Sequence, residues 1–164
     1  MEPATRAALR AYVKLLRATR AIVARVEPML AAEGLTMTQF GVLEALLHRG
    51  PLTHRELGRK VLTSAGNMTD VVDKLEARGL VQRIRDAGDR RLVRVELTET
   101  GRATISALFL RHARDIAAAM SGLASSDLEA LGDLLRSLGT AAARAEPAEP
   151  SLATPSLATV ESAS

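Results

Sequence analysis

The sequence contains no cysteine and no tryptophan, and only one tyrosine and two phenylalanines occur among its 164 residues. The absence of cysteine excludes a disulfide scaffold, a cysteine-ligated zinc site and a thiol nucleophile. No apolar run reaches the length of about 18 residues that a membrane-spanning helix needs. Basic residues interrupt the N-terminal segment every three or four positions, so it does not have the form of a secretory signal peptide. We therefore expect a cytoplasmic protein whose core is built from leucine, valine, isoleucine and alanine.

Charge is unevenly distributed along the chain. Residues 45–94 contain eleven basic and six acidic side chains, whereas residues 145–164 contain three acidic side chains and no basic one. A local excess of positive charge favours a polyanionic partner such as nucleic acid. The acidic end is rich in proline, alanine, serine and threonine, and it has few large apolar groups to offset the entropy of ordering. We predict one domain over residues 1–144 and a disordered tail over residues 145–164.

Apolar residues at helical spacing predict a long first helix over residues 5–33. Pro28 suits the first turn of a helix better than its interior, so we expect the regular helix to end or kink just before it. Gly34 is the expected C-terminal cap. Thr36 or Thr38 then caps a second helix.

The next segment has the pattern of a helix-turn-helix. Thr53, followed three residues later by Glu56, is a capping box and predicts a short helix. Thr63 or Ser64 caps a further helix, which Gly79 closes. Two helices joined by a short turn form the unit that places its second helix in the major groove of DNA.

Beyond Gly79 the spacing of apolar residues changes to alternation, which is typical of strands. We expect strands over Leu80–Arg85 and Leu92–Leu97, joined by the turn-forming segment Asp86–Asp89. A β-hairpin that follows a helix-turn-helix is called a wing, and this one is rich in arginine. Arginine at a hairpin tip suits the narrow, strongly negative minor groove of A/T-rich DNA.

Two more helices are predicted at the C-terminal side, over residues 99–121 after Thr98 and from Ser125 or Ser126 onward. We assign residues 36–98 to a winged helix-turn-helix core, and residues 5–33 and 99–143 to dimerisation helices. The alternative is that these helices only pack on their own core. The predicted fold class is mainly α with a small β-hairpin wing.

Several motifs occur in a recognisable order between Gly34 and Gly101. They are Gly34-Leu-Thr, Pro51-Leu-Thr-His-Arg-Glu-Leu57, Leu62-Thr-Ser-Ala-Gly-Asn-Met-Thr-Asp-Val-Val-Asp-Lys-Leu-Glu-Ala-Arg-Gly-Leu80, Asp89-Arg-Arg91 and Leu97-Thr-Glu-Thr-Gly101. In this order they resemble the winged-helix core of the multiple-antibiotic-resistance regulator (MarR) family. The resemblance implies a homodimeric transcriptional regulator, usually a repressor that a small, often aromatic, ligand releases from a pseudo-palindromic DNA operator.

Short polar and small residues near the start of the predicted recognition helix suit contact with bases and phosphates. The candidate DNA-binding residues of this helix are Thr63, Ser64, Ala65, Gly66, Asn67, Met68, Thr69 and Lys74. Those of the wing and its flanks are Thr53, His54, Arg83, Arg85, Asp89, Arg90 and Arg91. The family pattern implies that Asp89 orients Arg91. Asp70 departs from the family pattern, in which a basic or neutral residue is common at this place. Its charge lowers the local positive potential, which argues against a base contact at this point of the helix.

The resemblance also implies an effector pocket between the dimerisation helices and the winged core. The candidate residues are Tyr12, Leu16, Arg17, Met37, Phe40, Leu43, His48 and Phe109, with Arg17 or His48 as the polar group. These residues are equally consistent with an ordinary core. Glu33, His48 and His112 are conceivable ligands of a metal-responsive member, but the separation of the histidines favours no metal site.

No catalytic constellation is recognisable. The sequence has no Ser-His-Asp spacing, no phosphate-binding glycine loop and no paired carboxylates in an apolar setting, so we predict neither enzymatic activity nor a cofactor. The remaining alternative is a winged-helix module that binds proteins and never contacts DNA. A basic wing argues against it.

Overall fold

The computed structural model describes residues 2–61, 65–86, 88–89 and 91–144. Residues 62–64, residue 90 and the predicted tail lie outside the described residues, and with them the predicted contacts of Thr63, Ser64 and Arg90. The chain forms two compact units, Met1–Gly122 and Leu123–Ser164. Among the described residues, no helix has the length and apolar character needed to cross a membrane.

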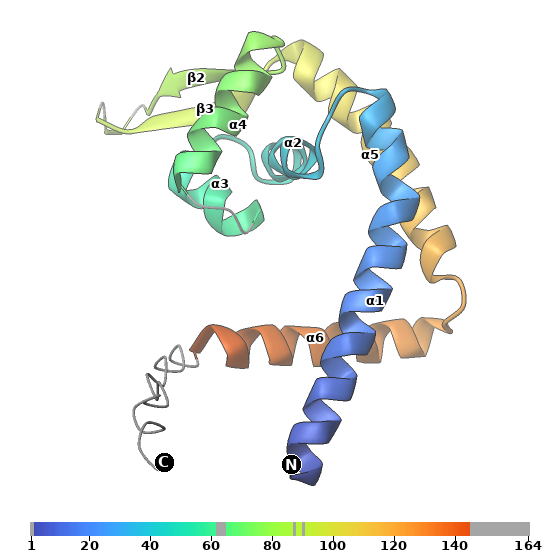
Figure 1. Ribbon diagram of the computed structural model, residues 1–164. Coiled ribbons are helices and arrows are strands. Elements are labelled where there is room, and N and C mark those ends of the chain that lie inside the picture. The colour runs from blue at the N-terminus through green and yellow to red at the C-terminus, as the bar shows by residue number, and fades with distance from the viewer. Residues whose placement is uncertain (1, 62–64, 87, 90, 145–164) are drawn as a thin grey trace, which may run out of the picture. The chain divides into compact units, whose positions relative to one another are not determined.

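In its described residues, the first unit contains eight helices and strands, which form a winged helix and its N-terminal extension (Figure 1). These are α1 (Pro3–Ala32), α2 (Met37–Arg49), β1 (Leu52–Thr53), α3 (His54–Val61), α4 (Ala65–Ala77), the strands β2 (Val81–Arg85) and β3 (Val93–Leu97), and α5 (Glu99–Met120). The second unit contains α6 (Ser125–Arg144). The predicted fold class, mainly α with a small hairpin wing, is confirmed.

Helix α1 continues through Pro28, so the expectation that the helix could end before this residue is wrong. Pro28 removes only one N–H near the C-terminal end of the helix, and the following turn still packs, because Leu30 is fully buried. The helix ends at Ala32, and Gly34 follows it with a left-handed φ of 65°. The N–H groups of Gly34 and Leu35 donate to the carbonyls of Ala31 and Leu30, which is a Schellman motif.

Side-chain caps fix where the helices of the winged core begin. Thr36 Oγ1 accepts from the Gln39 N–H (3.2 Å) and the Gln39 side chain accepts from the Thr36 N–H (2.9 Å). The predicted capping box of α3 is confirmed, because Glu56 accepts from both the N–H and the hydroxyl of Thr53. Each cap satisfies backbone donors that have no partner within the helix.

The sheet has three antiparallel strands in the order β1-β3-β2. In the hairpin, Val81 pairs with Leu97 and Arg85 with Val93. The two-residue strand β1 was not predicted, and it pairs Leu52 with Val95. A segment of two residues is too short to show the alternation of apolar and polar residues that predicts a strand. Only its pairing with β3 identifies β1 as a strand.

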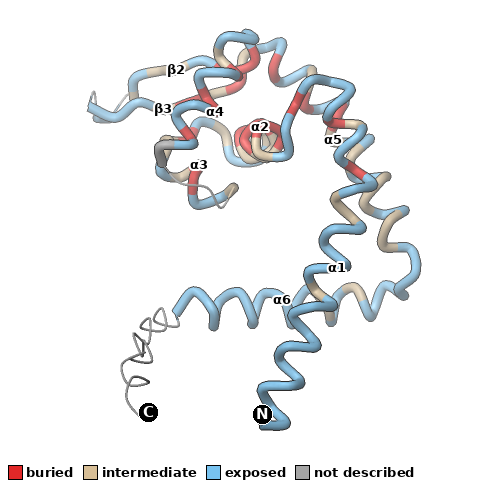
Figure 2. Tube along the Cα trace, viewed as in Figure 1, coloured by how far each residue is buried: buried red, intermediate tan, exposed pale blue. Residues whose placement is uncertain are grey.

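The core lies where α2 is surrounded by the other helices of the winged domain (Figure 2). Phe40, Leu43 and Leu46 of α2 are almost completely buried, together with Met68 and Leu75 of α4. Figure 2 also shows that the N-terminal half of α1 is exposed. In α6 no residue is buried, and Leu134, Leu135 and Leu138 are exposed.

Two further contacts connect α1 to the rest of the first unit. The Arg78 guanidinium, which follows α4, donates to the carbonyls of Gly34 (2.7 Å) and Glu33 (2.9 Å) at the end of α1. The Glu33 carboxylate accepts in turn from Arg111 of α5 at 2.9 Å. The end of the recognition helix is therefore fastened to both long helices of this unit.

Candidate nucleic-acid interface

Helix α4 is the recognition helix of the helix-turn-helix, and its two faces are distinct. Val72 and Leu75 face the core, and Met68 has no exposed surface. Asn67 and Thr69 are exposed on the other side. The predicted contact of Met68 with DNA is therefore corrected: its side chain fills the core, because helical spacing puts it on the face of Val72 and Leu75.

The middle of α4 carries an exposed ion pair between Lys74 and Asp70, whose charged atoms are 2.7 Å apart. This pair joins positions i and i+4 on the helix surface. Asp70 therefore neutralises the cation that was predicted to approach phosphate. The first turn of α4, which begins at Ala65, contains no acidic residue.

Arg83 at the centre of β2 faces helix α4. Its guanidinium forms ion pairs with Asp73 and Glu76, and its backbone N–H donates to Glu76 at 3.1 Å. Its side chain is about one quarter exposed. Arg83 was predicted to contact DNA, but this arrangement makes it a bridge that holds the wing against α4.

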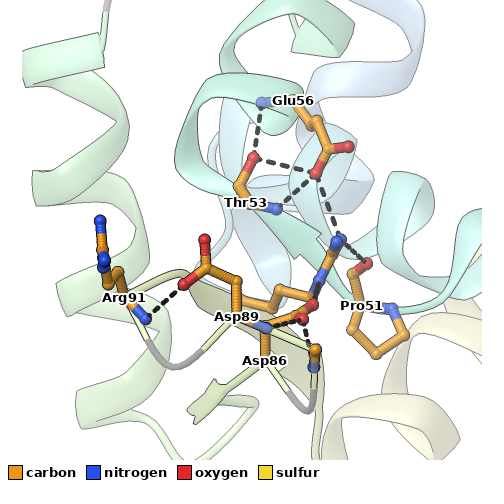
Figure 3. A network of polar contacts seen from close by, with 8 residues as sticks. Pro51, Thr53, Glu56, Asp86, Asp89 and Arg91 are labelled. Atoms are coloured by element: carbon orange, nitrogen blue, oxygen red, sulfur yellow. Dashed lines mark hydrogen bonds and ion pairs between the residues drawn. The ribbon is translucent and has the colours of Figure 1, made fainter.

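A second network anchors the wing to the helix-turn-helix (Figure 3). The Arg94 guanidinium of β3 pairs with the Asp86 carboxylate at the end of β2. It also lies 3.5 Å from Glu56 of α3 and 3.4 Å from the Pro51 carbonyl. Asp86 was predicted only as a turn residue. Ile84 pairs with Arg94 across the hairpin, and Asp86 is two residues beyond Ile84. Asp86 is therefore the diagonal neighbour of Arg94 on the same face, which the alternation of the two strands could have indicated.

The Asp86 carboxylate also organises the turn of the wing. It accepts from the backbone N–H groups of Gly88 (2.9 Å) and Asp89 (3.0 Å). The hydrogen bond from Arg94, followed by these two backbone bonds, lowers the pKa of Asp86 to about 2. The carboxylate is therefore ionised at any physiological pH.

The tip of the wing presents Arg91 to solvent (Figure 3). The Asp89 carboxylate accepts from the backbone N–H of Arg91 at 3.0 Å, while the Arg91 side chain extends away from it. The implied role of Asp89 is corrected accordingly: it shapes the turn and makes no ion pair with the guanidinium. Arg85 is also exposed, and neither arginine is in an ion pair within the described residues.

Thr53 and His54 lie at the start of α3. The Thr53 hydroxyl is engaged in the capping box. His54 is half-buried, and burial, followed by the charge of Arg83, lowers the pKa of its imidazole. His54 is therefore mainly neutral at pH 7.

Three of the predicted effector residues, Phe40, His48 and Phe109, form ring contacts in which His112, not predicted for this pocket, also takes part. Phe40 and His112 pack with ring centroids 4.4 Å apart, and His48 meets Phe109 edge-on at 5.0 Å, all between α2 and α5. His112 Nδ1 is buried and has no hydrogen-bond partner in the described part of the chain.

Within the described part of the chain, the other predicted effector residues make no ring contact, and only Leu43 shares the core cluster with Phe40. Tyr12 and Leu16 are 57% and 40% exposed on α1, and Arg17 is exposed beside them. Leu43 is fully buried in the core, and Met37 is at the exposed start of α2.

An open depression of about 430 Å³ lies between α2 and the end of α3. Its lining comprises Gly41, Glu44, Ala45, His48, Arg49, Lys60 and Val61. Only His48 was among the predicted effector residues, because the spacing of charged residues on α2 gives no signal for a hollow that α3 completes.

The residues considered for a metal are not brought together. Glu33 is ion-paired with Arg111, while His48 and His112 pack against different phenylalanine rings. In the described part of the chain, no three histidine or carboxylate side chains form a group that would hold a metal ion.

Comparison with known proteins identifies this architecture. The model of the MarR family matches residues 35–93, which run from the start of α2 to the second strand of the wing. The HTH-type transcriptional regulator MhqR of Bacillus subtilis (strain 168) is 33% identical over 135 residues, which cover 82% of this chain and 93% of the relative.

Solved structures agree in both fold and sequence. A probable transcriptional regulator from Pseudomonas aeruginosa is 35% identical with a TM-score of 0.68, covering 77% of this chain and 94% of that one. Bordetella bronchiseptica BpsR, whose DNA binding is regulated by 6-hydroxynicotinic acid, is 29% identical with a TM-score of 0.70, covering 79% and 98%. These relatives are regulators and not enzymes.

Proposed function

This chain belongs to the MarR family of DNA-binding transcriptional regulators, and we propose that it is a homodimeric, cytoplasmic repressor of a pseudo-palindromic operator. The observation that carries the proposal is the exposed arginine pair of the wing, Arg85 and Arg91, beside the exposed polar residues of α4. In this proposal α4 enters the major groove and the wing tip follows the adjacent minor groove.

Exposed apolar side chains on the terminal helices support a dimer. Leu9, Tyr12 and Val13 are each at least 41% exposed on α1, and Leu134 and Leu138 are more than half exposed on α6. Apolar groups in such number on adjacent turns are costly in water and mark an interaction surface. A two-fold dimer would cover them and present two recognition helices.

Selection of duplexes from a random DNA pool by the purified protein tests this proposal. Two recognition helices about 34–36 Å apart require half-sites centred about 10 bp from each other, related by inverted symmetry. Enrichment of such an inverted repeat is the expected result. Enrichment of a single unrepeated element, or of none, contradicts the proposed dimeric operator binding.

We further propose that a small aromatic acid or phenol releases the operator. The ring cluster of Phe40, His48, Phe109 and His112 supports an aromatic ligand, and Arg17 of α1 would supply the positive charge for its acidic group. Because Tyr12 and Leu16 are exposed, a second subunit would be needed to enclose the site. The Arg78 contacts give a physical route from α1 to the end of α4.

Titration of phenols and hydroxylated aromatic acids into a preformed DNA complex tests effector release. Release by at least one compound in wild type, with a weaker response in a His48→Ala variant that still binds the operator, is the expected result. If no compound releases DNA at concentrations up to about 1 mM, any binding of these compounds to the protein is weaker than about −4 kcal/mol, and the effector proposal fails.

A further inference from the structure

Helix α1 carries a continuous basic face that the DNA-reading elements do not explain. The cations are Arg6, Arg10, Lys14, Arg17, Arg20 and Arg25, and all six are exposed. At 3.6 residues per turn they fall within an arc of about 140°. With a rise of 1.5 Å per residue, they extend over about 28 Å along the helix.

This face has no compensating negative charge of its own. No acidic residue occurs between Pro3 and Val26, and the first turn of α1 has none either. Within the described residues, none of the six cations forms an ion pair. Its positive potential is therefore directed at solvent.

The arrangement opposes the local stability of the helix. Arg6, Arg10 and Lys14 follow one another at i,i+4 spacing, where like charges destabilise a helix by about 0.2–0.5 kcal/mol per pair. Cations in the first turns also oppose the helix dipole. An anionic partner would offset both costs.

A second copy of the chain would leave part of this face accessible. The exposed apolar side chains of α1, which include Leu9, Tyr12 and Leu16, are centred about 100° around the helix from the basic face. Arg10, Lys14 and Arg25 lie on the part of the basic face farthest from these apolar side chains, so a subunit seated on the apolar side need not cover them.

We propose that the basic face of α1 is a second DNA-contacting surface, which binds the phosphates of a duplex without reading its sequence. DNA is the anionic partner that the winged helix already requires, and it carries one charge per about 1.7 Å of its axis. Guanidinium groups, five of the six cations here, present several donors to phosphate oxygens. The proposal relies on the DNA binding of the family, but not on repression, dimeric operator geometry or the effector.

The triple variant Arg6→Gln/Arg10→Gln/Lys14→Gln tests this surface. Fluorescence anisotropy is measured over a salt series with two duplexes of about 60 bp, one containing the selected operator and one of unrelated sequence. Each lost phosphate contact should reduce the slope of log K against log salt by about 0.9. We expect a shallower slope and a loss of about tenfold at low salt for both duplexes, with their affinity ratio unchanged.

A matched variant controls for net charge. Arg102→Gln/Arg114→Gln/Arg144→Gln removes three exposed cations that form no ion pair in the described residues and lie outside α1 and the wing. Its slope should stay near that of the wild type. Equal slopes for the two triple variants would overturn the proposal.

Two other readouts distinguish competing roles of the same cations. The melting temperature of the α1 variant should stay the same or rise, because repulsion between neighbouring cations is relieved. A marked fall would show that the cations stabilise the fold or the dimer, and would overturn the proposal. The variant is also made in a chain ending at residue 144. If its effect on DNA binding disappears there, the acidic segment 145–164 is the partner of this face and DNA is not.

The failure of this proposal and of the proposed function are distinguishable. A protein that selects no inverted repeat but shows the α1 effect on unrelated duplex contradicts only the operator model. A protein that selects the repeat and shows no α1 effect contradicts only the second surface.

Discussion

The Arg94 guanidinium is paired with the Asp86 carboxylate across the two strands of the wing, next to its turn, and the same guanidinium reaches Glu56 at the start of α3. Asp86 in turn accepts the backbone N–H groups that form the turn. The position of Arg91 at the wing tip is therefore set from the helix-turn-helix itself. This arrangement fixes the direction in which the hairpin extends before any DNA is bound.

The Asp86–Arg94 pair predicts an acid-dependent change confined to the wing. The pKa of Asp86 is lowered from 3.8 to about 2, so its contribution to folding is complete above pH 3.8 and is lost as the pH falls from 3.8 toward 2. The carboxyl ¹³C shift of Asp86, followed by NMR, should titrate near pH 2 in the wild type. In Arg94→Gln the midpoint should move toward 3.8. A wild-type midpoint already near 3.8 contradicts the pairing.

Arg83 and Arg85 are two residues apart on β2, and we expect opposite effects from their removal. Arg83→Ala leaves Asp73 and Glu76 without their shared cation, which should cost about 1 kcal/mol of unfolding free energy and leave the salt slope of DNA binding unchanged. Arg85→Ala should change stability by less than about 0.5 kcal/mol and make the slope shallower. Thermal melts and anisotropy on both variants check this. The reverse pattern would mean that Arg83 is the DNA contact.

Gly101 in the first turn of α5 is required by a close approach of the backbone. A Cβ at this position would lie 1.8 Å from the carbonyl oxygen of Leu80. Gly101→Ala should therefore destabilise the domain by about 3 kcal/mol or more, because the backbone would have to move. Gly139→Ala is the matched control, since a Cβ there meets nothing within 4 Å and alanine favours the helix. Chemical denaturation that finds both variants equally stable would contradict this packing.

The sequence predicted the elements that have local signals. The spacing of Thr53 and Glu56 predicted the capping box of α3, and Gly79 predicted the end of α4. Alternating apolar residues predicted the two strands of the hairpin. Local patterns of this kind arise from backbone hydrogen bonding within a few residues. They are readable without knowledge of the rest of the fold.

The direction in which individual side chains point was predicted less well. As an arginine in a basic wing, Arg83 was predicted to contact DNA. Its guanidinium instead forms an ion pair with Asp73, which lies on α4. Met68 sits in the motif that reads DNA, but helical spacing places it on the buried face. The continuation of α1 through Pro28 depends on the tertiary burial of Leu30. The role of Arg83 and the course of α1 depend on packing between segments, which a single-sequence pattern does not contain, whereas the burial of Met68 follows from a helical spacing that the sequence already shows.

The contribution of Arg91 to DNA binding is the most direct test of the proposed interface. Arg91→Ala, Arg91→Lys and Asp89→Asn are compared with the wild type by fluorescence anisotropy on the selected operator over a salt series. Melting curves serve as the control, and they should shift little because residues 89 and 91 are exposed.

Arg91→Ala should weaken operator binding by about tenfold or more and reduce the salt slope by about two per dimer. Arg91→Lys should recover part of the loss, since an ammonium fits a narrow minor groove less well. Asp89→Asn should bind nearly as the wild type does, because the amide oxygen still accepts the Arg91 N–H. If Arg91→Ala binds the operator like the wild type at every salt concentration, the wing does not contact DNA and the proposed interface is wrong.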